Sequence, residues 1–274
     1  MSYATLLVYV NVDHVSKQLV RVAAGLADKF SARLIGLSAL AIMPPVAAEG
    51  VVIVDNATEF DIAKMKAKLE ETGNKVHAAA GERRQTEWRS FLDFPTETLI
   101  TEARSADLIV VEKNKASWDI HRVADNGAVI LAAGRPILVV PAAVKCLTAD
   151  HVVVGWKDTR EARRAVQDAL PFLHQAKRVT IVEICEKGQM ETARRHVDDV
   201  VGYLAGHRIK AEARVETQLL GSTGADQIVG LAVDEGADLL VTGAYGHSRL
   251  NEWVFGGMTR DLLRSSPICC LMSH

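Results

Sequence analysis

The chain of 274 residues contains one pattern of apolar segments twice. ADLIVVE (residues 106–112) resembles ADLLVTG (residues 237–243), and RPILVV (residues 135–140) resembles SPICCL (residues 266–271). Both pairs are offset by 131 residues, whereas LLVYV (residues 6–10) and VVVGW (residues 152–156) are offset by 146. Segments that recur in one order at a fixed spacing indicate an internal duplication, which fixes the architecture before any other feature does. The first copy carries 15 extra residues, which we assign to residues 41–60, rich in proline and small residues.

Each copy alternates short apolar runs with amphipathic stretches. The predicted strands of the first copy are residues 6–10, 33–39, 86–90, 107–112 and 137–140, and those of the second are 151–156, 178–184, 209–216, 237–243 and 267–272. Asp158 or Thr159 is the expected N-cap of the helix that follows the first strand of the second copy. Alternating strands and helices favour right-handed crossovers and parallel sheets. We therefore expect a tandem α/β protein, with two doubly wound, five-stranded parallel-sheet domains at residues 1–143 and 150–274.

Composition removes several classes of function. The net charge is -2, with 24% charged residues, so nothing at this level indicates binding to DNA or RNA. No apolar run reaches the roughly 18 residues of a membrane span, and the first residues lack the pattern of a signal peptide. The expectation is a cytoplasmic protein with no membrane partner. No CxxC spacing is present, and Cys269 and Cys270 are expected to be buried core thiols.

The segment TGAYGHSRLNEWVFGGMTRDLL (residues 242–263) joins the fourth strand of the second copy to a short helix. Ligands of open parallel sheets bind outside the carboxyl ends of the strands. Gly243 is expected to let a ligand approach the backbone, and Gly246 to adopt a positive φ. Gly256 and Gly257 precede a helix whose N-terminal N–H groups favour an anion such as phosphate. The alternative is a surface loop that uses its glycines only for turns.

Three side chains in the same segment suit an anion. The hydroxyl of Thr259 is expected beside the helix N-terminus, and His247 and Arg249 supply positive charge. No GxxxxGK[ST] motif is present, and GHSRL lacks the second glycine of a nucleophile elbow. The segment therefore predicts phosphate binding by backbone groups rather than by a P-loop.

The spacing G-x-x-G-x9-G of Gly243, Gly246 and Gly256 resembles the ATP-binding motif of the universal stress protein family. Together with TGAYGHSR, GWKDTREARRAV and GRPILVVP, it makes the whole chain similar to the tandem form of that family. The resemblance implies an adenine nucleotide α-hydrolase-like fold in which the fifth strands of the two domains pair as an intramolecular pseudo-dimer. It also implies ATP at the carboxyl end of the second sheet, with Mg²⁺ carried by the phosphates.

The same resemblance assigns roles to individual residues. Gly243 and Gly246 would contact ribose and phosphates, and the backbone N–H groups around Gly257 would hold the phosphates. The remaining implied contacts are the adenine neighbours Trp156, Lys157 and Ile184 and the phosphate neighbours Gly256, Met258 and Thr259. The chain departs from the family at two positions, because Lys157 stands where an aspartate is common and Gly257 where a serine or threonine is common.

The first copy serves as an internal control for the glycines. The offset of 131 places Glu112, Lys115, Asp125 and Asn126 at the positions of the four glycines. Side chains would then occupy the space of a phosphate, and Glu112 and Asp125 would repel its negative charge. This copy, whose motif is degenerate, is therefore expected to be a structural or regulatory partner of the second copy. Trp118, His121 and Arg122 in its crossing leave open another ligand or a packed lid.

The sequence thus favours a stress-response protein that binds ATP in its C-terminal domain and acts as a nucleotide-dependent regulatory or protective module. The expected partners are an adenine nucleotide, a second copy of the chain in a homodimer, and proteins that the sequence does not identify. The alternatives are a slow ATP hydrolase and a ligand-independent dimeric scaffold. No catalytic residue and no protein-bound metal are predicted, since no general base or His/Cys cluster stands out, and any ATPase activity is expected to be weak.

Overall fold

The computed structural model describes residues 2–42, 47–48, 51–52, 59–81, 86–113, 119–246 and 257–274. The elements of the first half are β1 (Thr5–Tyr9), α1 (Lys17–Phe30), β2 (Arg33–Ala39), β3 (Ala47–Ala48), β4 (Val51–Val52), α2 (Glu59–Ala80), β5 (Thr86–Phe91), α3 (Pro95–Glu102), η1 (Ala103–Ser105), β6 (Leu108–Glu112), α4 (Asn126–Ala132) and β7 (Ile137–Val140). Those of the second half are β8 (His151–Trp156), α5 (Arg160–Leu173), β9 (Arg178–Cys185), α6 (Met190–Gly206), β10 (Glu212–Thr217), α7 (Gly224–Asp234), β11 (Leu239–Gly243), α8 (Gly257–Ser265) and β12 (Cys269–Ser273).

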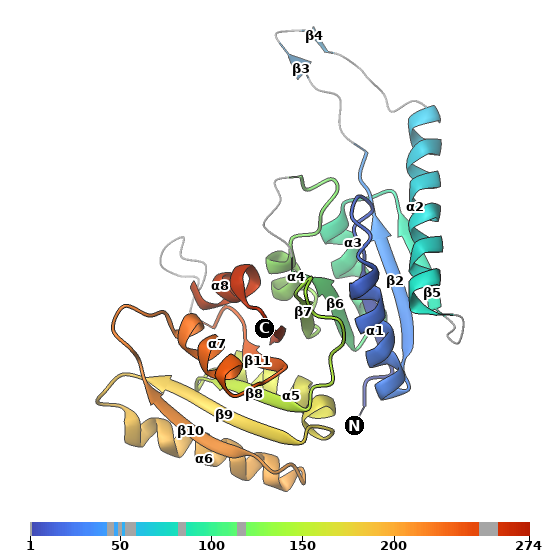
Figure 1. The fold of residues 1–274 in the computed structure, drawn as a ribbon. Helices are drawn as coiled ribbons and strands as arrows, with labels where there is room; N and C mark the ends of the chain where they lie inside the picture. Colours follow the sequence, from blue (N-terminus) through green and yellow to red (C-terminus); the bar gives the residue numbers. More distant parts are fainter. Residues whose placement is uncertain are drawn as a thin grey trace.

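Ten strands form one continuous sheet in the order β10-β9-β8-β11-β12-β7-β6-β1-β2-β5 (Figure 1). Within each half the strands are parallel, and the order from the outer edge inward is third, second, first, fourth, fifth. The halves meet where β12 pairs antiparallel with β7, with Leu271 opposite Leu138. The predicted fold and the pairing of the two fifth strands are therefore confirmed.

The extra residues of the first copy fall between β2 and α2. Residues 40–58 make this connection, whereas residues 186–189 make the equivalent connection between β9 and α6. The described part of the first connection includes β3 and β4, which pair antiparallel as a separate two-stranded sheet. In Figure 1 this small sheet lies well away from the ten-stranded one.

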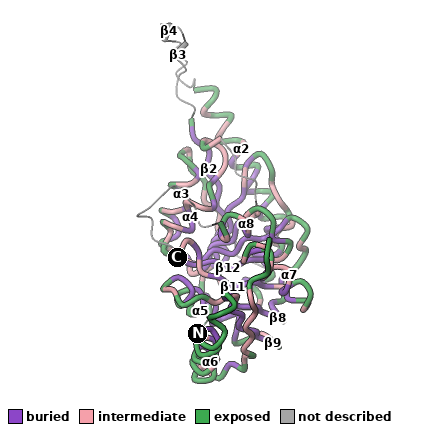
Figure 2. The backbone as a smooth tube through the Cα atoms, turned by 90° about the vertical axis from the view of Figure 1, so that its left-hand side faces the viewer, coloured by how far each residue is buried: buried purple, intermediate pink, exposed green. Residues whose placement is uncertain are grey.

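Two hydrophobic layers cover the faces of the sheet. One contains side chains from α1, α5 and α6, and the other contains side chains from α3, α4, α7 and α8. Figure 2 shows the buried backbone concentrated in the central strands and the exposed backbone on the outer helices. Both Cys269 and Cys270 are buried, as expected, and burial raises the pKa of the Cys269 thiol to about 12.

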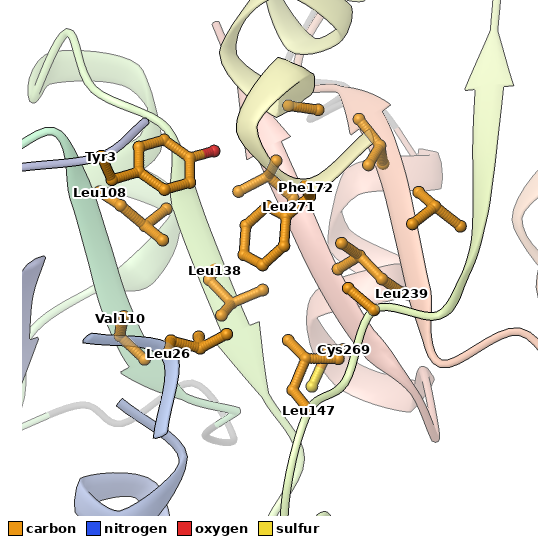
Figure 3. Close-up of a cluster of buried hydrophobic side chains, with 14 of the residues drawn as sticks. Tyr3, Leu26, Leu108, Val110, Leu138, Leu147, Phe172, Leu239, Cys269 and Leu271 are labelled. Atoms are coloured by element: carbon orange, nitrogen blue, oxygen red, sulfur yellow. The ribbon is translucent and has the colours of Figure 1, made fainter. Parts of the chain in front are cut away.

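Both layers run across the seam between the halves. Phe172 of α5 is fully buried, and its ring centroid lies 5.6 Å from that of Tyr3 in the first half (Figure 3). The ring centroid of Phe30, also from the first half, lies 5.0 Å from that of Phe172. The hydroxyl of Tyr3 donates to the backbone oxygen of Asp168, at 2.5 Å. Each half therefore completes the core of the other.

Local capping explains where the helices at the carboxyl edge begin. Ser16 accepts a hydrogen bond from the N–H of Leu19 and caps α1, and Thr159 accepts from the N–H of Ala162 and caps α5. A hydroxyl acceptor at this position satisfies one of the unpaired N–H groups of the first turn. Of the two caps considered from the sequence, Thr159 is the one used, while Asp158 pairs with Arg163.

Asp13 ties the β1–α1 connection to the rest of the first half. Its carboxylate accepts from Arg122 at 2.6 and 2.7 Å and also pairs with Lys68. The Arg122 guanidinium is the main cause that lowers the pKa of Asp13 from 3.8 to about 2. A lowered folded-state pKa stabilises the fold above pH 3.8, and this stabilisation is lost as the pH falls through about 2.

Replacing Asp13 with asparagine is therefore expected to flatten the dependence of stability on pH between about 4 and 2. The change should stay below about 1 kcal/mol, because the ion pairs are partly exposed to solvent. Urea denaturation of both proteins at a series of pH values measures it, with the exposed Asp199→Asn as the matched control. An unaltered pH profile in the Asp13 variant would contradict the assignment.

Candidate functional site

The candidate site lies at the carboxyl ends of β8, β9 and β11, beside the first turn of α8. The N–H of Tyr245, just after β11, donates to the hydroxyl oxygen of Thr259 at 3.1 Å. Thr259 is only 4% exposed, so its hydroxyl holds the post-strand loop rather than projecting into solvent. This bond brings the start of the loop after β11, which contains Gly246, next to the first turn of α8.

The glycines do not all serve the expected purpose. A Cβ placed on Gly243 would lie 2.6 Å from the backbone N of Ala162 and 2.6 Å from the backbone carbon of Glu161. The first turn of α5 thus fills the space that was expected for a ligand, and close packing against that helix itself requires the glycine. The positive φ lies on Tyr245, at 59°, and Gly246 is not among the residues with positive φ. The expectation for Gly246 was wrong because the bond to Thr259 fixes the reversal one residue earlier.

The first residue of α8, Gly257, is exposed. Among the residues that the structure describes, only a carboxylate oxygen of Asp261 would come within 4 Å of a Cβ on Gly257, at 3.9 Å. Met258 is half-buried and packs against the layer containing α7 and α8. Three residues expected near the phosphates, His247, Arg249 and Gly256, lie outside the described residues.

The residues expected near adenine separate onto two faces of the sheet. Trp156 packs against the layer containing α5 and α6, whereas Ile184 packs against the opposite layer, with α7. The indole N–H of Trp156 is buried and has no hydrogen-bond partner among the residues that the structure describes. Lys157 is exposed, and its backbone oxygen accepts from the N–H of Thr159 at 2.7 Å.

The sequence did not predict a contact between an acid and a histidine beside Trp156. Glu183, the strand neighbour of Trp156 on β9, lies with its Oε2 3.2 Å from Nδ1 of His196 on α6. Burial raises the pKa of Glu183, and the interaction with His196 opposes that shift. The 13-residue separation in sequence gave no signal, because an acid in an apolar strand and a histidine in a charged helix are unremarkable singly.

The first half fills the equivalent positions with side chains. β6 ends at Glu112 as β11 ends at Gly243, and α4 begins at Asn126 as α8 begins at Gly257. The carboxylate of Asp125 accepts the N–H groups of Gly127 at 2.8 Å and of Ala128 at 3.3 Å. An internal carboxylate therefore occupies the N-terminus of this helix.

The first half nevertheless retains a cavity of about 190 Å³ at the carboxyl ends of β1 and β6. It is lined by Tyr9, Val10, Asn11, His14, Ser16, Leu19, Val111, Glu112, Val123 and Asn126. Val123 of the crossing lines the cavity, whereas the ring of His121 packs on Phe94 with centroids 5.2 Å apart and Arg122 pairs with Asp13. Trp118 lies outside the described residues.

The two halves also touch at these sites. A Cβ on Gly127 of α4 would lie 2.7 Å from the hydroxyl oxygen of Tyr245, and Nζ of Lys113 donates to the backbone oxygen of Ser266 at 2.8 Å. The loop after β11 is thus in contact with the helix whose first residue, Asn126, lines the cavity of the first half.

Two features are missing from the described part of the chain. Residues 2–42, 47–48, 51–52, 59–81, 86–113, 119–246 and 257–274 contain no group of three His, Cys, Asp or Glu side chains that could hold a metal ion. None of the helices in that same part of the chain is long and apolar enough to cross a membrane.

Comparison with known proteins confirms the resemblance stated above. Residues 148–274 match the model of the Universal stress protein family. A search of curated proteins gives no match.

Similar folds are found among solved structures over nearly the whole chain. A universal stress protein from Archaeoglobus fulgidus DSM 4304 is 16% identical, with a TM-score of 0.69 over 98% of this chain and 95% of that one. A putative universal stress protein from Pseudomonas aeruginosa UCBPP-PA14 is 12% identical, with a TM-score of 0.62 over 99% of this chain and 93% of that one. A functionally unknown protein, PA1789 from Pseudomonas aeruginosa PAO1, is 13% identical, with a TM-score of 0.61 over 99% of this chain and 92% of that one. At these identities the likeness shows the fold.

Proposed function

We propose that the C-terminal half, which matches the universal stress protein family over residues 148–274, binds an adenine nucleotide. We further propose that the first half responds to whether that nucleotide is bound. The bond between the Tyr245 N–H and the Thr259 hydroxyl carries the proposal. It supports the proposal because it places the start of the loop after β11 beside the first turn of α8, whose first residue, Gly257, is exposed. Helix N-termini with free N–H groups favour phosphate.

The proposed ligand is ATP, with Mg²⁺ carried by its phosphates. Backbone donors at Gly257, Met258 and Thr259 would face the phosphate chain, while Trp156, Lys157 and Ile184 would lie toward the base. His247, Arg249 and Gly256 belong to the proposed site from their sequence positions. The proposed boundaries of the two domains are residues 1–143 and 150–274, and the proposed assembly is a homodimer acting as a stress-response module.

Gly257→Glu tests the phosphate end of the site. A carboxylate at the first residue of α8 would oppose the phosphates at roughly 4–6 Å, which is expected to weaken ATP binding at least tenfold. Calorimetric titration of the full chain with ATP measures the change. Gly202→Glu, on the exposed face of α6 with open space around it, is the matched control.

Two outcomes would count against the proposal. Absence of ATP binding at millimolar concentration would remove it, and equal affinity in the Gly257 and Gly202 variants would remove α8 from the site. Phosphate release measured over hours separates a binding module from the alternative of a slow hydrolase. Unchanged partner binding with and without ATP would favour a ligand-independent scaffold.

A further inference from the structure

Glu161 is a buried acid beside the glycines of the candidate site. It is the second residue of α5, a position usually open to solvent, yet the residue is only 4% exposed. A Cβ on Gly243 would lie 2.9 Å from Cβ of Glu161, and a Cβ on Gly246 would lie 3.1 Å from its Oε2. The side chain therefore runs along the loop from one glycine to the other.

The Glu161 carboxylate is already satisfied by donors around the start of α5. Burial alone would raise its pKa, but hydrogen bonds from Arg160, from its own backbone N–H and from the Thr159 hydroxyl outweigh burial and lower it. The Arg160 guanidinium contacts Oε1 directly. The group is consequently a carboxylate at neutral pH, held by a helix N-terminus.

Those donors are of the kind that binds phosphate. Backbone N–H groups at a helix N-terminus, a threonine hydroxyl and a guanidinium together form an anion-binding set. In the first half an internal carboxylate, that of Asp125, takes the two N–H groups at the start of α4. Each half thus has a carboxylate side chain at a helix N-terminus near its candidate site: Asp125 at α4 and Glu161 at α5.

We propose that the Glu161 carboxylate acts as an internal anion of the C-terminal site. It competes with the ligand for the hydrogen-bond donors around it and so lowers the affinity of the site for highly charged anionic ligands. The inference rests on the proposed nucleotide site. The ratio of the ATP Kd to the adenosine Kd would then be higher in the wild-type chain than in a chain that lacks the charge of Glu161.

The test compares ATP with adenosine in three versions of the full chain. Glu161→Gln keeps the shape of the side chain and removes its charge, so the ratio of the ATP Kd to the adenosine Kd is expected to fall about tenfold or more. Arg160→Gln removes the positive charge that faces Glu161, so the same ratio is expected to rise. The Arg160 side chain is 80% exposed. Glu97→Gln, an exposed acid in the first turn of α3, is the matched control.

The outcomes separate this inference from the function on which it rests. An unchanged ratio in Glu161→Gln, with ATP still bound and the melting temperature within a few degrees of the wild type, overturns the role of Glu161 and leaves the nucleotide site standing. Absence of ATP and adenosine binding in the wild type and in Glu161→Gln removes both. A Glu161→Gln variant that does not fold leaves Arg160→Gln as the deciding measurement, and an unchanged or lower ratio there overturns the inference.

Discussion

Replacing Phe172 with alanine is expected to lower the free energy of unfolding by about 3–5 kcal/mol. The ring is fully buried and packs edge-on against Phe30 and Tyr3 of the first half, with centroids 5.0 and 5.6 Å away. Removing it opens a cavity that α5 and α1 cannot both close, since each is fixed to its own strands. Urea denaturation followed by circular dichroism measures the change.

The position of Phe172 between the halves sharpens this expectation. Tyr203→Ala on α6 removes an aromatic ring that is 47% exposed, and it should cost much less. Because both halves contribute to the cavity in the Phe172 variant, both should lose stability. A loss below about 1 kcal/mol in that variant, similar to that of Tyr203→Ala, would show that the ring does not join the two cores.

Replacing Gly243 with alanine is expected to destabilise the fold by on the order of 3 kcal/mol. The added methyl group would lie 2.6 Å from backbone atoms of both Glu161 and Ala162, and backbone atoms cannot turn aside as the end of a side chain can. The start of α5 must therefore shift away from β11. Thermal and urea denaturation report the loss of stability.

Gly202→Ala supplies a control of opposite sign. Gly202 lies within α6, and no atom of the described residues stands within 4 Å of a Cβ placed on it. Alanine favours a helix over glycine by up to about 1 kcal/mol. The same substitution is thus expected to destabilise at the end of β11 and to stabilise on α6. Equal stabilities for Gly243→Ala and the wild type would show that α5 does not require this glycine.

The strands and the duplication could be predicted because both are visible in short stretches of sequence. Apolar runs and alternating patterns predicted all ten strands of the large sheet to within a few residues, whereas the pairing of β7 with β12 was implied by the family resemblance. A short helix after the glycines was likewise expected, and α8 begins one residue earlier than predicted, at Gly257. Periodicity carries this information because strand burial repeats along the sequence.

The reasons behind individual site residues could not be predicted in the same way. Gly243 is required by a helix that begins 83 residues earlier, and the positive φ of Tyr245 accompanies a bond to a residue 14 positions later. Glu161 gave no signal, because an acid in the first turn of an amphipathic helix ordinarily faces solvent. These properties depend on which elements come to lie side by side, and single-sequence patterns do not record that.

The antiparallel junction of β7 and β12 has a consequence for how the two sites can change over time. In a dimer of identical chains, every substitution appears in both copies, so a mutation that closes one site closes the other. Here the two copies are separate stretches of one polypeptide that share a single sheet. Selection can therefore retain the common interface while one site changes, as at Glu112 and Asp125, and the other keeps its glycines. One half is thereby free to take a different role.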